Sequence, residues 1–373
     1  MILISQKTTL PRKQTRAREL LELIAIFGEF PSNLLTRLSG GASYKETIVT
    51  ALKQQGLIKT HYADGLRGLR LTTRAKKLLL ADNPNRFSFF MDENSDTNHV
   101  RSEPHRRERL YRIAEAIVAM KNADVKVFRD ERPTIFSREW ENGEFIEEPL
   151  FYSSREIQEL GYQYSKMKGS RSVGVLLTEQ DVFITYSLNE SLIKWSYKSE
   201  MRMKILIQNY LCLDRMSYQY SRNNLNGLLL GNSMELALKI FESSRQQYFV
   251  LDGNYDNFYF VTKDEKGDML LRLLCRPELC CELDEILTDD LYPQQSGFLV
   301  ENDAMTEDGR PVMLAYKCEL NRIRRFNTAL TLREMSGVII CFDYQAEVLR
   351  RYCSEAVEFQ TIDYEKTERR FFS

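Results

Sequence analysis

The spacing of apolar residues near the N-terminus predicts three helices followed by a hairpin. In three consecutive segments apolar residues recur three and four positions apart, which places them on one side of a helix. Glycines mark the turn before the third helix and the loop between two short apolar strands. The predicted helices are 17–27, 34–38 and 43–55, and the predicted strands are 57–60 and 69–72. This order of elements is typical of a winged helix-turn-helix domain.

The third predicted helix has an apolar side and a polar side. Ile48, Leu52 and either Tyr44 or Val49 are spaced to face the core. The other side carries hydroxyl, amide and cationic groups that can bond to phosphates and to base edges in a major groove. The predicted DNA contacts there, in the wing and in the following helix are Ser43, Lys45, Thr47, Thr50, Lys53, Arg67, Arg70 and Lys76. A merely solvated face and a protein-binding winged helix are the alternatives.

The rest of the chain alternates strand and helix patterns, which predicts a mixed α/β body and an α+β protein as a whole. Asn-Pro and a run of Asp, Asn and Ser predict a linker before this body. The apolar run Met269–Leu274 is interpreted as one of the body's strands. The predicted domains are a winged helix-turn-helix at 1–82, a linker at 83–103 and a body at 104–373, divisible into 104–220 and 221–373.

One predicted strand of the body, Pro311–Leu320, carries the only candidates for catalysis. A metal-dependent nuclease needs an acid, followed on a strand by an acid and a lysine one residue apart, to hold Mg²⁺ and activate water. Asp303 or Asp308 precedes this strand, and Lys317 and Glu319 are spaced to share one face, but in reversed order. Alternation is common on any half-buried strand. The pattern therefore favours a structural role for both side chains.

Composition narrows the class of protein further. The hydrophobic content is 43% and the apolar runs are far shorter than the roughly 18 residues that a membrane span needs. The N-terminus has no signal-peptide pattern. Seven cysteines without a CxxC pair do not form a disulfide or zinc framework. We expect a cytoplasmic protein without membrane contact, metal or cofactor, whose cysteines are mostly buried thiols.

Charge is distributed unevenly along the chain. Residues 1–85 contain 14 Lys and Arg against 6 Asp and Glu, a net charge of +8, whereas the whole chain has −1. The remaining 288 residues therefore carry −9. A basic first domain on an acidic body suits polyanion binding by the first domain. A second basic run at 101–109 either extends the DNA footprint or is a solvated start of a helix.

Three segments carry a resemblance to a known family. They are QGLIK (55–59), which ends the third helix and begins the hairpin, LTTRAKKLL (71–79), and HR (105–106) before an alanine-rich helix. With the glycine wing, they resemble the replication-relaxation proteins of plasmids and integrative elements in Gram-positive bacteria. The resemblance implies DNA binding in replication or mobilisation, and a C-terminal domain similar to a restriction-endonuclease-like fold. The family's acidic strand would correspond to residues 316–319.

These observations together predict a binding protein rather than an enzyme. We expect a sequence-specific, double-stranded DNA-binding protein of a mobile genetic element, accessory to its replication or to its mobilisation by conjugation. A replication or relaxosome protein and a second copy of the chain are the expected partners. The first alternative is a transcriptional regulator with a sensing or partner-binding body. The second is a metal-dependent DNA nickase or nuclease that uses Lys317 and Glu319.

Overall fold

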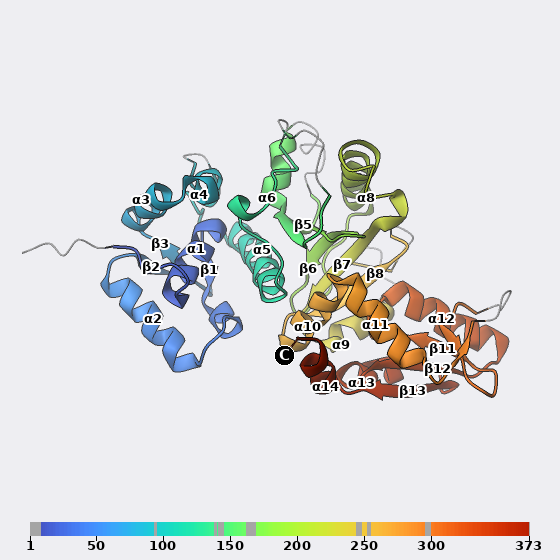
Figure 1. The fold of residues 1–373 in the computed structure, drawn as a ribbon. Coiled ribbons are helices and arrows are strands. Elements are labelled where there is room, and N and C mark those ends of the chain that lie inside the picture. Colours follow the sequence, from blue (N-terminus) through green and yellow to red (C-terminus); the bar gives the residue numbers. More distant parts are fainter. Residues whose placement is uncertain are drawn as a thin grey trace, which may run out of the picture. The chain divides into compact units, whose positions relative to one another are not determined.

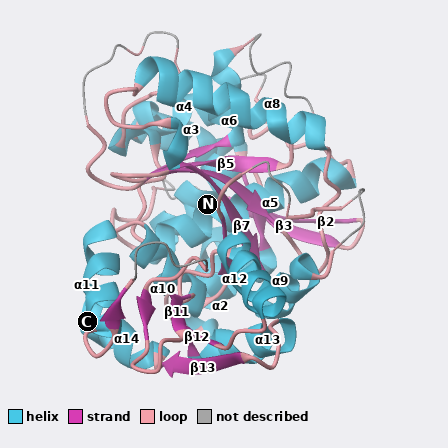
Figure 2. Cartoon of the chain, turned by 90° about the vertical axis from the view of Figure 1, so that its right-hand side faces the viewer, coloured by secondary structure: helices cyan, strands magenta, loops and turns pink. Residues whose placement is uncertain are grey.

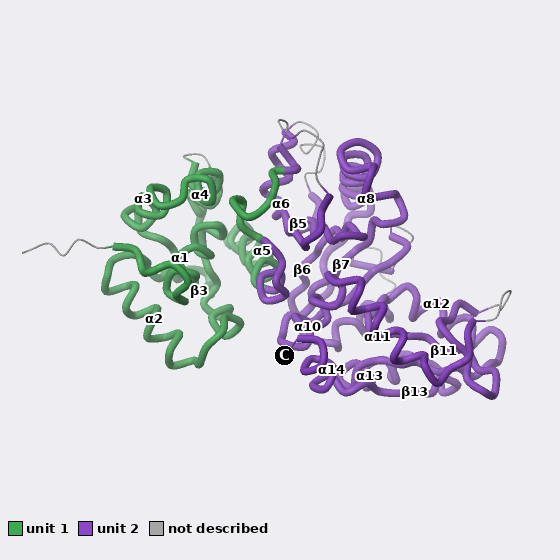
Figure 3. Tube along the Cα trace, in the orientation of Figure 1, with its two compact units in different colours: residues 1–118, 127–134 green, residues 119–126, 135–373 purple. Residues whose placement is uncertain are grey.

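The chain forms two compact units, drawn in green and purple in Figure 3. Unit 1 comprises residues 1–118 and 127–134, and unit 2 comprises residues 119–126 and 135–373. Helices and three β-sheets give a mixed α+β protein (Figure 1). The computed structural model describes residues 9–92, 95–137, 140, 145–161, 169–243, 248–251, 255–294 and 300–372. Within these ranges, none of the helices combines the length and apolar character that a membrane crossing requires.

Unit 1 combines helices with a three-stranded antiparallel sheet of order β1-β3-β2. Its elements are α1 (Arg16–Phe27), β1 (Phe30–Pro31), the 3-10 helix η1 (Ser32–Arg37), α2 (Ala42–Gln54), β2 (Ile58–Ala63), β3 (Leu66–Leu71), α3 (Thr73–Asp82), α4 (Pro84–Met91), α5 (Pro104–Asn122) and η2 (Arg129–Glu131). The division between the units falls within α5. Asp64 and Gly65 both have positive φ, as the two-residue type I′ turn between paired strands requires.

Unit 1 decides one alternative that the sequence left open and differs from one prediction. Of the two candidates for the core side of α2, Val49 is buried together with Leu52, whereas Tyr44 is 53% exposed. Ile48 is half-buried. The segment predicted as a linker contains α4, which packs on α1 and α3 and buries Phe87 and Phe90. Unit 1 therefore extends beyond residue 82, where the first domain was predicted to end. The reason is that Phe87 and Phe90, in an otherwise polar segment, are buried in the core of unit 1.

The first sheet of unit 2 has the strand order β4-β5-β6-β7-β8. The pairs β4–β5 and β5–β6 are antiparallel, and β6–β7 and β7–β8 are parallel. Every residue of β5, β6 and β7 is buried, in agreement with their mostly apolar sequences. The elements are β4 (Leu150–Ser153), α6 (Ser154–Ile157), η3 (Gln158–Leu160), β5 (Ser172–Leu177), β6 (Val182–Ser187), α8 (Tyr197–Ile207), the π-helix η4 (Gln208–Arg215), η5 (Arg222–Asn224), β7 (Leu225–Gly231), α9 (Met234–Phe241) and β8 (Phe258–Thr262).

The second sheet of unit 2 has the order β13-β12-β11-β10-β9 (Figure 2). The strands β11, β12 and β13 are parallel and are joined by helical crossovers. Its core includes Met313, Ile323, Phe326, Ile339 and Leu349. The elements are α10 (Glu265–Leu274), α11 (Pro277–Thr288), β9 (Tyr292–Pro293), β10 (Ala304–Met305), β11 (Pro311–Leu314), α12 (Leu320–Arg333), β12 (Gly337–Phe342), α13 (Asp343–Tyr352), β13 (Val357–Ile362) and α14 (Tyr364–Phe372).

Two predicted strands of the body are wrong. Met269–Leu274 belongs to helix α10, which the Asp264 carboxylate begins by accepting a hydrogen bond from the Gly267 N–H. A short apolar run does not distinguish a buried helix from a strand. The predicted strand Pro311–Leu320 ends at Leu314, and Leu320 already begins α12. Between them the chain turns, with Cys318 in the left-handed region at a φ of 52°.

Candidate nucleic-acid interface

Helix α2 presents most of its surface to solvent. Of its thirteen residues, only Val49 and Leu52 are buried, and through this narrow stripe the helix packs on α1 and β2. Four of the predicted DNA contacts lie on its exposed surface: Ser43, Thr47, Thr50 and Lys53. The Thr47 hydroxyl donates to the Ser43 carbonyl at 2.9 Å, so its oxygen is left as an acceptor. The helix therefore has a polar face that the core does not use.

Among the predicted DNA-binding residues of α2, Lys45 bonds to a neighbouring element of unit 1. Its Nζ lies 3.0 Å from the Thr36 carbonyl oxygen, near the end of η1, and the side chain is partly buried. A lysine ammonium near a helix C-terminus satisfies a carbonyl that lacks an intrahelical partner. Because an ammonium has three N–H groups, Lys45 can join η1 to α2 and still donate outward.

The hairpin β2–β3 carries an exposed pair at its tip. Tyr62 lies directly opposite Arg67 in the strand register, both side chains are exposed, and Tyr62 has 70% of its surface in solvent. Directly opposed residues lie on the same face of a sheet. That face also carries Ile58 and Leu71, which are buried in unit 1. The tip therefore extends beyond the core and presents an aromatic ring beside a guanidinium.

Two of the predicted contacts are bonded inside unit 1 instead. Arg70 lies on the opposite face of the hairpin, where its Nε is 2.8 Å from the buried Glu29 carboxylate. The Lys76 Nζ donates to the Asn98 backbone carbonyl at 2.6 Å and to its side-chain oxygen at 2.7 Å. Burial, followed by nearby Lys59 and Arg70, lowers the pKa of Lys76. Both side chains join segments of unit 1 that are distant in sequence.

Ion pairs within unit 1 occupy most of its early acidic side chains. Of the six acids in residues 1–85, four lie in ion pairs: Glu19, Glu22, Glu29 and Asp82. The exposed cations that make no ion pair or side-chain hydrogen bond within the described ranges include Lys53, Lys59, Arg67, Arg74 and Lys77. The positive charge of unit 1 that is free of ion pairs is therefore concentrated at residues such as these.

The candidate nuclease residues of unit 2 are engaged in other contacts. The Lys317 Nζ pairs with the Asp284 carboxylate on α11 at 2.9 Å. The Glu319 carboxylate caps α12, where it accepts from the Asn321 N–H at 3.1 Å and from the Arg322 N–H. It also accepts from the Phe258 N–H at 3.0 Å and so connects α12 to β8. Burial raises the pKa of Glu319 to about 7, against the lowering effect of these backbone bonds.

The acids that precede these residues are bonded as well. Asp303 accepts from the Leu314 N–H at 2.7 Å and pairs with Arg322 at 2.6 Å. Asp308 pairs with Arg310 at 2.7 Å on the surface. In the part of the chain that the structure describes, no three His, Cys, Asp or Glu side chains are close enough to share a metal ion. Lys317, Glu319 and Asp303 therefore join different elements of unit 2 to one another.

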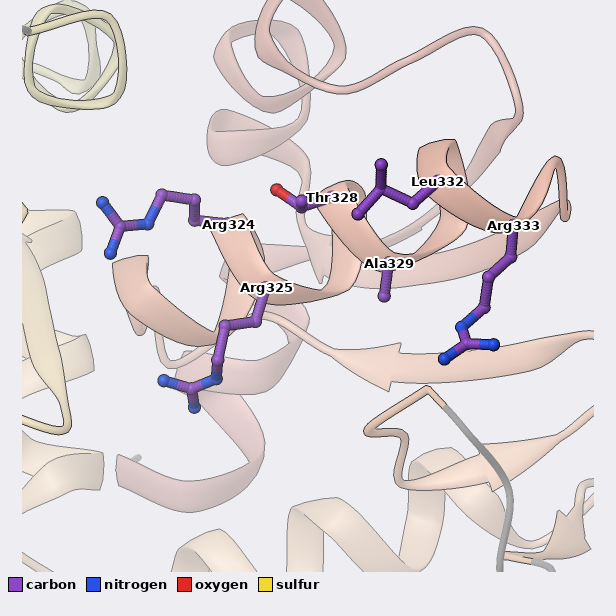
Figure 4. Close-up of a pocket in the computed structure, with 6 residues that line it drawn as sticks. All are labelled: Arg324, Arg325, Thr328, Ala329, Leu332 and Arg333. Atoms are coloured by element: carbon purple, nitrogen blue, oxygen red, sulfur yellow. The ribbon is translucent and has the colours of Figure 1, made fainter.

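A shallow hollow lies on α12 in unit 2 (Figure 4). Six residues of this helix line it: Arg324, Arg325, Thr328, Ala329, Leu332 and Arg333. Two of its cations are bonded elsewhere, because Arg324 donates to the Leu251 carbonyl and Arg325 pairs with Glu301 at 3.1 Å. All lining residues come from one helix, so the hollow does not bring different elements together.

Sequence reasoning missed Lys59 and both exposed tyrosines of unit 1. The position of Tyr62 beside the turn of the predicted hairpin could have indicated that its side chain is exposed. Tyr44 satisfied a helical core spacing and gave no such signal. No protein-family model matches the chain, and no curated protein or solved structure is significantly similar to it.

Proposed function

We propose that unit 1 is a winged helix-turn-helix domain that binds double-stranded DNA. In this proposal α2 enters the major groove and the hairpin β2–β3 is the wing that contacts the adjacent backbone. The observation that carries it is the pairing of an exposed polar helix face with an exposed cationic hairpin tip, in a unit whose early acids lie mostly in ion pairs. The order of helices and strands supports the same proposal.

The revised contact set follows from which side chains are available. Ser43, Thr47, Thr50 and Lys53 supply contacts from α2, and Arg67 with Tyr62 supplies them from the hairpin tip. Lys59 is exposed on the other face of the hairpin, opposite Arg70, and can supply a separate phosphate contact. Lysine and arginine neutralise phosphates, and hydroxyl groups reach phosphates or base edges. Arg70 and Lys76 are assigned to the support of this surface, because their donors are bonded within unit 1.

The biological role that we propose rests on the family resemblance. It is accessory DNA binding, in the cytoplasm, during replication or mobilisation of a plasmid or integrative element. Unit 2 then supplies the surface for a replication or relaxosome protein. The contacts of Lys317 and Glu319 favour this binding role over a nuclease. A transcriptional regulator with a sensing body is distinguished from it by where on the genome the protein binds.

The experiment is a selection of bound fragments from the source genome by the purified full-length protein, with and without Mg²⁺. Sequencing then measures both enrichment and strand breaks. We expect enrichment of an origin-like or transfer region without metal-dependent breaks, and loss of that enrichment in the double variant Lys53→Ala/Arg67→Ala. Enrichment at the protein's own promoter favours the regulator instead. No enrichment contradicts DNA binding, and metal-dependent breaks contradict the non-enzymatic role.

A matched control separates a contact surface from a general effect of charge. Lys366 on α14 is exposed over 82% of its side chain and belongs to unit 2. Lys366→Ala/Lys198→Ala removes the same two charges as the double variant in unit 1, and both positions are exposed. We expect unchanged enrichment in this control. An equal loss in both double variants would mean that net charge, rather than the proposed surface, governs binding.

We further propose that the protein binds as a homodimer, because winged-helix and helix-turn-helix proteins commonly read paired half-sites. Light scattering of the protein with an enriched fragment measures the mass of the complex. A mass that corresponds to two chains on each DNA fragment is the expected result. A single chain on each fragment would contradict the dimer while leaving DNA binding intact.

A further inference from the structure

Unit 1 contains an ion pair that is completely removed from solvent. Glu29 and Arg107 are both 0% exposed. The Arg107 Nη2 lies 2.6 Å from Glu29 Oε1, and its Nε lies 3.2 Å from each carboxylate oxygen. The same carboxylate accepts from the Tyr111 hydroxyl at 2.6 Å and pairs with Arg70 at 2.6 Å. One carboxylate thus joins the segment after α1, the strand β3 and the helix α5.

The Arg107 guanidinium also holds the turn of the hairpin. Its Nη1 donates to the Ala63 carbonyl at 2.7 Å, and its Nη2 donates to the Leu66 carbonyl at 3.0 Å. Ala63 and Leu66 face each other as the last pair before the turn. A planar guanidinium can serve two such acceptors in fixed directions, which a lysine ammonium does not do equally well. Arg107 therefore fixes both sides of the hairpin turn relative to α5.

A glycine lets the carboxylate approach the strand. A Cβ atom on Gly68 would lie 2.2 Å from Glu29 Oε1 and 2.4 Å from Glu29 Cγ, well inside contact distance. Any side chain at this position of β3 would push Glu29 away. Glycine is the residue used where a close approach to the backbone is required. A glycine at position 68 of β3 is therefore required for Glu29 to reach its position in the ion pair.

The cluster keeps its charges despite burial. Burial raises the pKa of Glu29, but the hydrogen bonds from Arg107, Tyr111 and Arg70 outweigh it and leave that pKa lowered. Burial and the bond to Glu29 raise the pKa of the Tyr111 hydroxyl, so this group stays a donor. A buried ion pair is weak evidence for stability, because an apolar replacement of similar volume is often as stable. A requirement for fixed geometry explains the cluster better.

We propose that Arg107 and Glu29 are positioning residues for DNA binding, which hold the β2–β3 hairpin in the orientation that lets its tip contact the DNA backbone. The inference rests on the proposed function of unit 1. A hairpin fixed before binding loses less conformational freedom in the complex, so it binds more tightly with the same contacts. Arg107 itself touches no DNA, because its side chain is enclosed by Glu29, Ala63 and Leu66.

The test uses the full-length variants Arg107→Lys and Gly68→Ala, which disturb the same contact from the helix and from the strand. Arg109→Lys is the matched control, because Arg109 is exposed on the same helix two residues away. Hydrogen exchange of the hairpin amides is measured without DNA. Affinity for an enriched fragment is then measured over a range of salt concentrations. Circular dichroism establishes that each variant keeps its helices.

We expect exchange in the hairpin about tenfold faster in both variants, with exchange in α2 unchanged. Affinity falls by about tenfold, on the order of 1.4 kcal/mol, and the salt slope stays that of the unaltered protein. In Arg107→Gln, which removes the charge, a slope lower by about one would show that Arg107 touches a phosphate and would overturn the proposal. Unchanged hairpin exchange, or faster exchange with full affinity, would overturn it as well.

Failure of the proposed function has a different signature. If the unaltered protein enriches no DNA fragment, the DNA-binding proposal fails, whatever the variants do. If it binds, and Arg107→Lys binds equally well despite a loosened hairpin, only the positioning proposal fails. Should Gly68→Ala lose its helices, Arg107→Lys and the conservative Glu29→Gln carry the same measurements. In Glu29→Gln the two arginines lose their counter-charge while the side-chain shape is kept.

Discussion

The β2–β3 hairpin of unit 1 and the segment 315–319 of unit 2 both carry charged residues that the sequence offered as candidates for function, but the contacts of these residues differ. In the hairpin, Arg70 turns inward to Glu29 while Arg67 remains exposed at the tip. In unit 2, Lys317 and Glu319 both find partners within the unit. The difference is the chain around them: the hairpin continues as a strand, whereas segment 315–319 turns into a helix that needs a cap.

This comparison shows what decides whether a charged side chain is available to a ligand. The first N–H groups of α12 have no acceptor within the helix, and the Glu319 carboxylate supplies one. At the hairpin tip the Ala63 and Leu66 carbonyls accept hydrogen bonds from the buried Arg107, and Arg67 stays exposed. Backbone groups without partners recruit nearby polar side chains, and side chains beyond their reach stay free for other molecules.

The largest expected effect concerns the inward face of the hairpin. Glu29→Ala leaves Arg107 buried without its counter-charge, and removal of one partner of a buried pair typically destabilises by about 3–5 kcal/mol. Hydrogen exchange of unit 1 peptides during a urea titration measures this loss. Glu46→Ala, an exposed acid on α2, serves as the control and should change stability by less than about 0.5 kcal/mol. A loss in Glu29→Ala as small as in the control would mean that the cluster is not structural.

The next effect concerns Glu319 and depends on pH. Its pKa is about 7 in the folded protein against an ordinary 4.5, so the folded state holds a proton that the unfolded state releases. Stability is therefore lost as pH rises from about 4.5 to about 7, by up to about 3 kcal/mol, and is constant above that range. Glu319→Gln does not titrate, and its stability should lack this decrease. Equal pH profiles for both proteins would contradict a proton held on Glu319.

Tryptophan emission is a suitable probe for that comparison. Both tryptophans belong to unit 2, and the buried Trp195 packs edge-on against Phe249 at 4.8 Å. It also lies near Phe258, whose N–H is bonded to Glu319. The urea concentration at the midpoint of unfolding, measured from this emission at several pH values, reports the stability of the region around Glu319. The difference between the two proteins removes the contribution of all other titrating groups.

The spacing of apolar residues predicted the kinds of element in the chain better than the residues at which they end. The alternating strand and helix patterns after residue 103 predicted a mixed α+β protein, and the structure is mixed α+β. The prediction of strand 311–320 was wrong. Its apolar and polar residues alternate as in a strand, but Cys318 has left-handed backbone angles and Glu319 caps the helix α12. Periodicity reports which side of an element is apolar, and it does not report where a tertiary contact stops that element.

The candidate site was predictable only in part for a similar reason. The exposed positions of α2 follow from its helical period, and Arg67 follows from the turn. The partner of Arg107 lies 78 residues earlier in the chain, and no local pattern connects them. A basic run at 101–109 therefore suggested solvent or DNA for a side chain that is fully buried. Long-range ion pairs are the part of a site that a single sequence hides.

A smaller effect separates the two faces of the hairpin directly. We expect Arg67→Ala to lower the slope of log affinity against log salt by about one, with unchanged stability, because Arg67 is exposed and contacts a phosphate in the proposal. Arg70→Ala should leave the slope unchanged and destabilise unit 1 instead, since its partner Glu29 is buried. Binding assays from low to moderate salt and urea titrations of both variants check this. The opposite pattern would reverse the assignment of the two faces.

The smallest effect is expected at Lys45, which the sequence placed among the DNA contacts and the structure joins to η1. Its ammonium bonds to the Thr36 carbonyl, so the charge is shared between a backbone acceptor and solvent. Lys45→Met keeps the apolar stem and should lower the salt slope by less than one, whereas Lys53→Met on the exposed face should lower it by about one. Equal slopes for the two variants would show that the Thr36 contact gives way to a phosphate in the complex, and α2 would then approach DNA through its first turns.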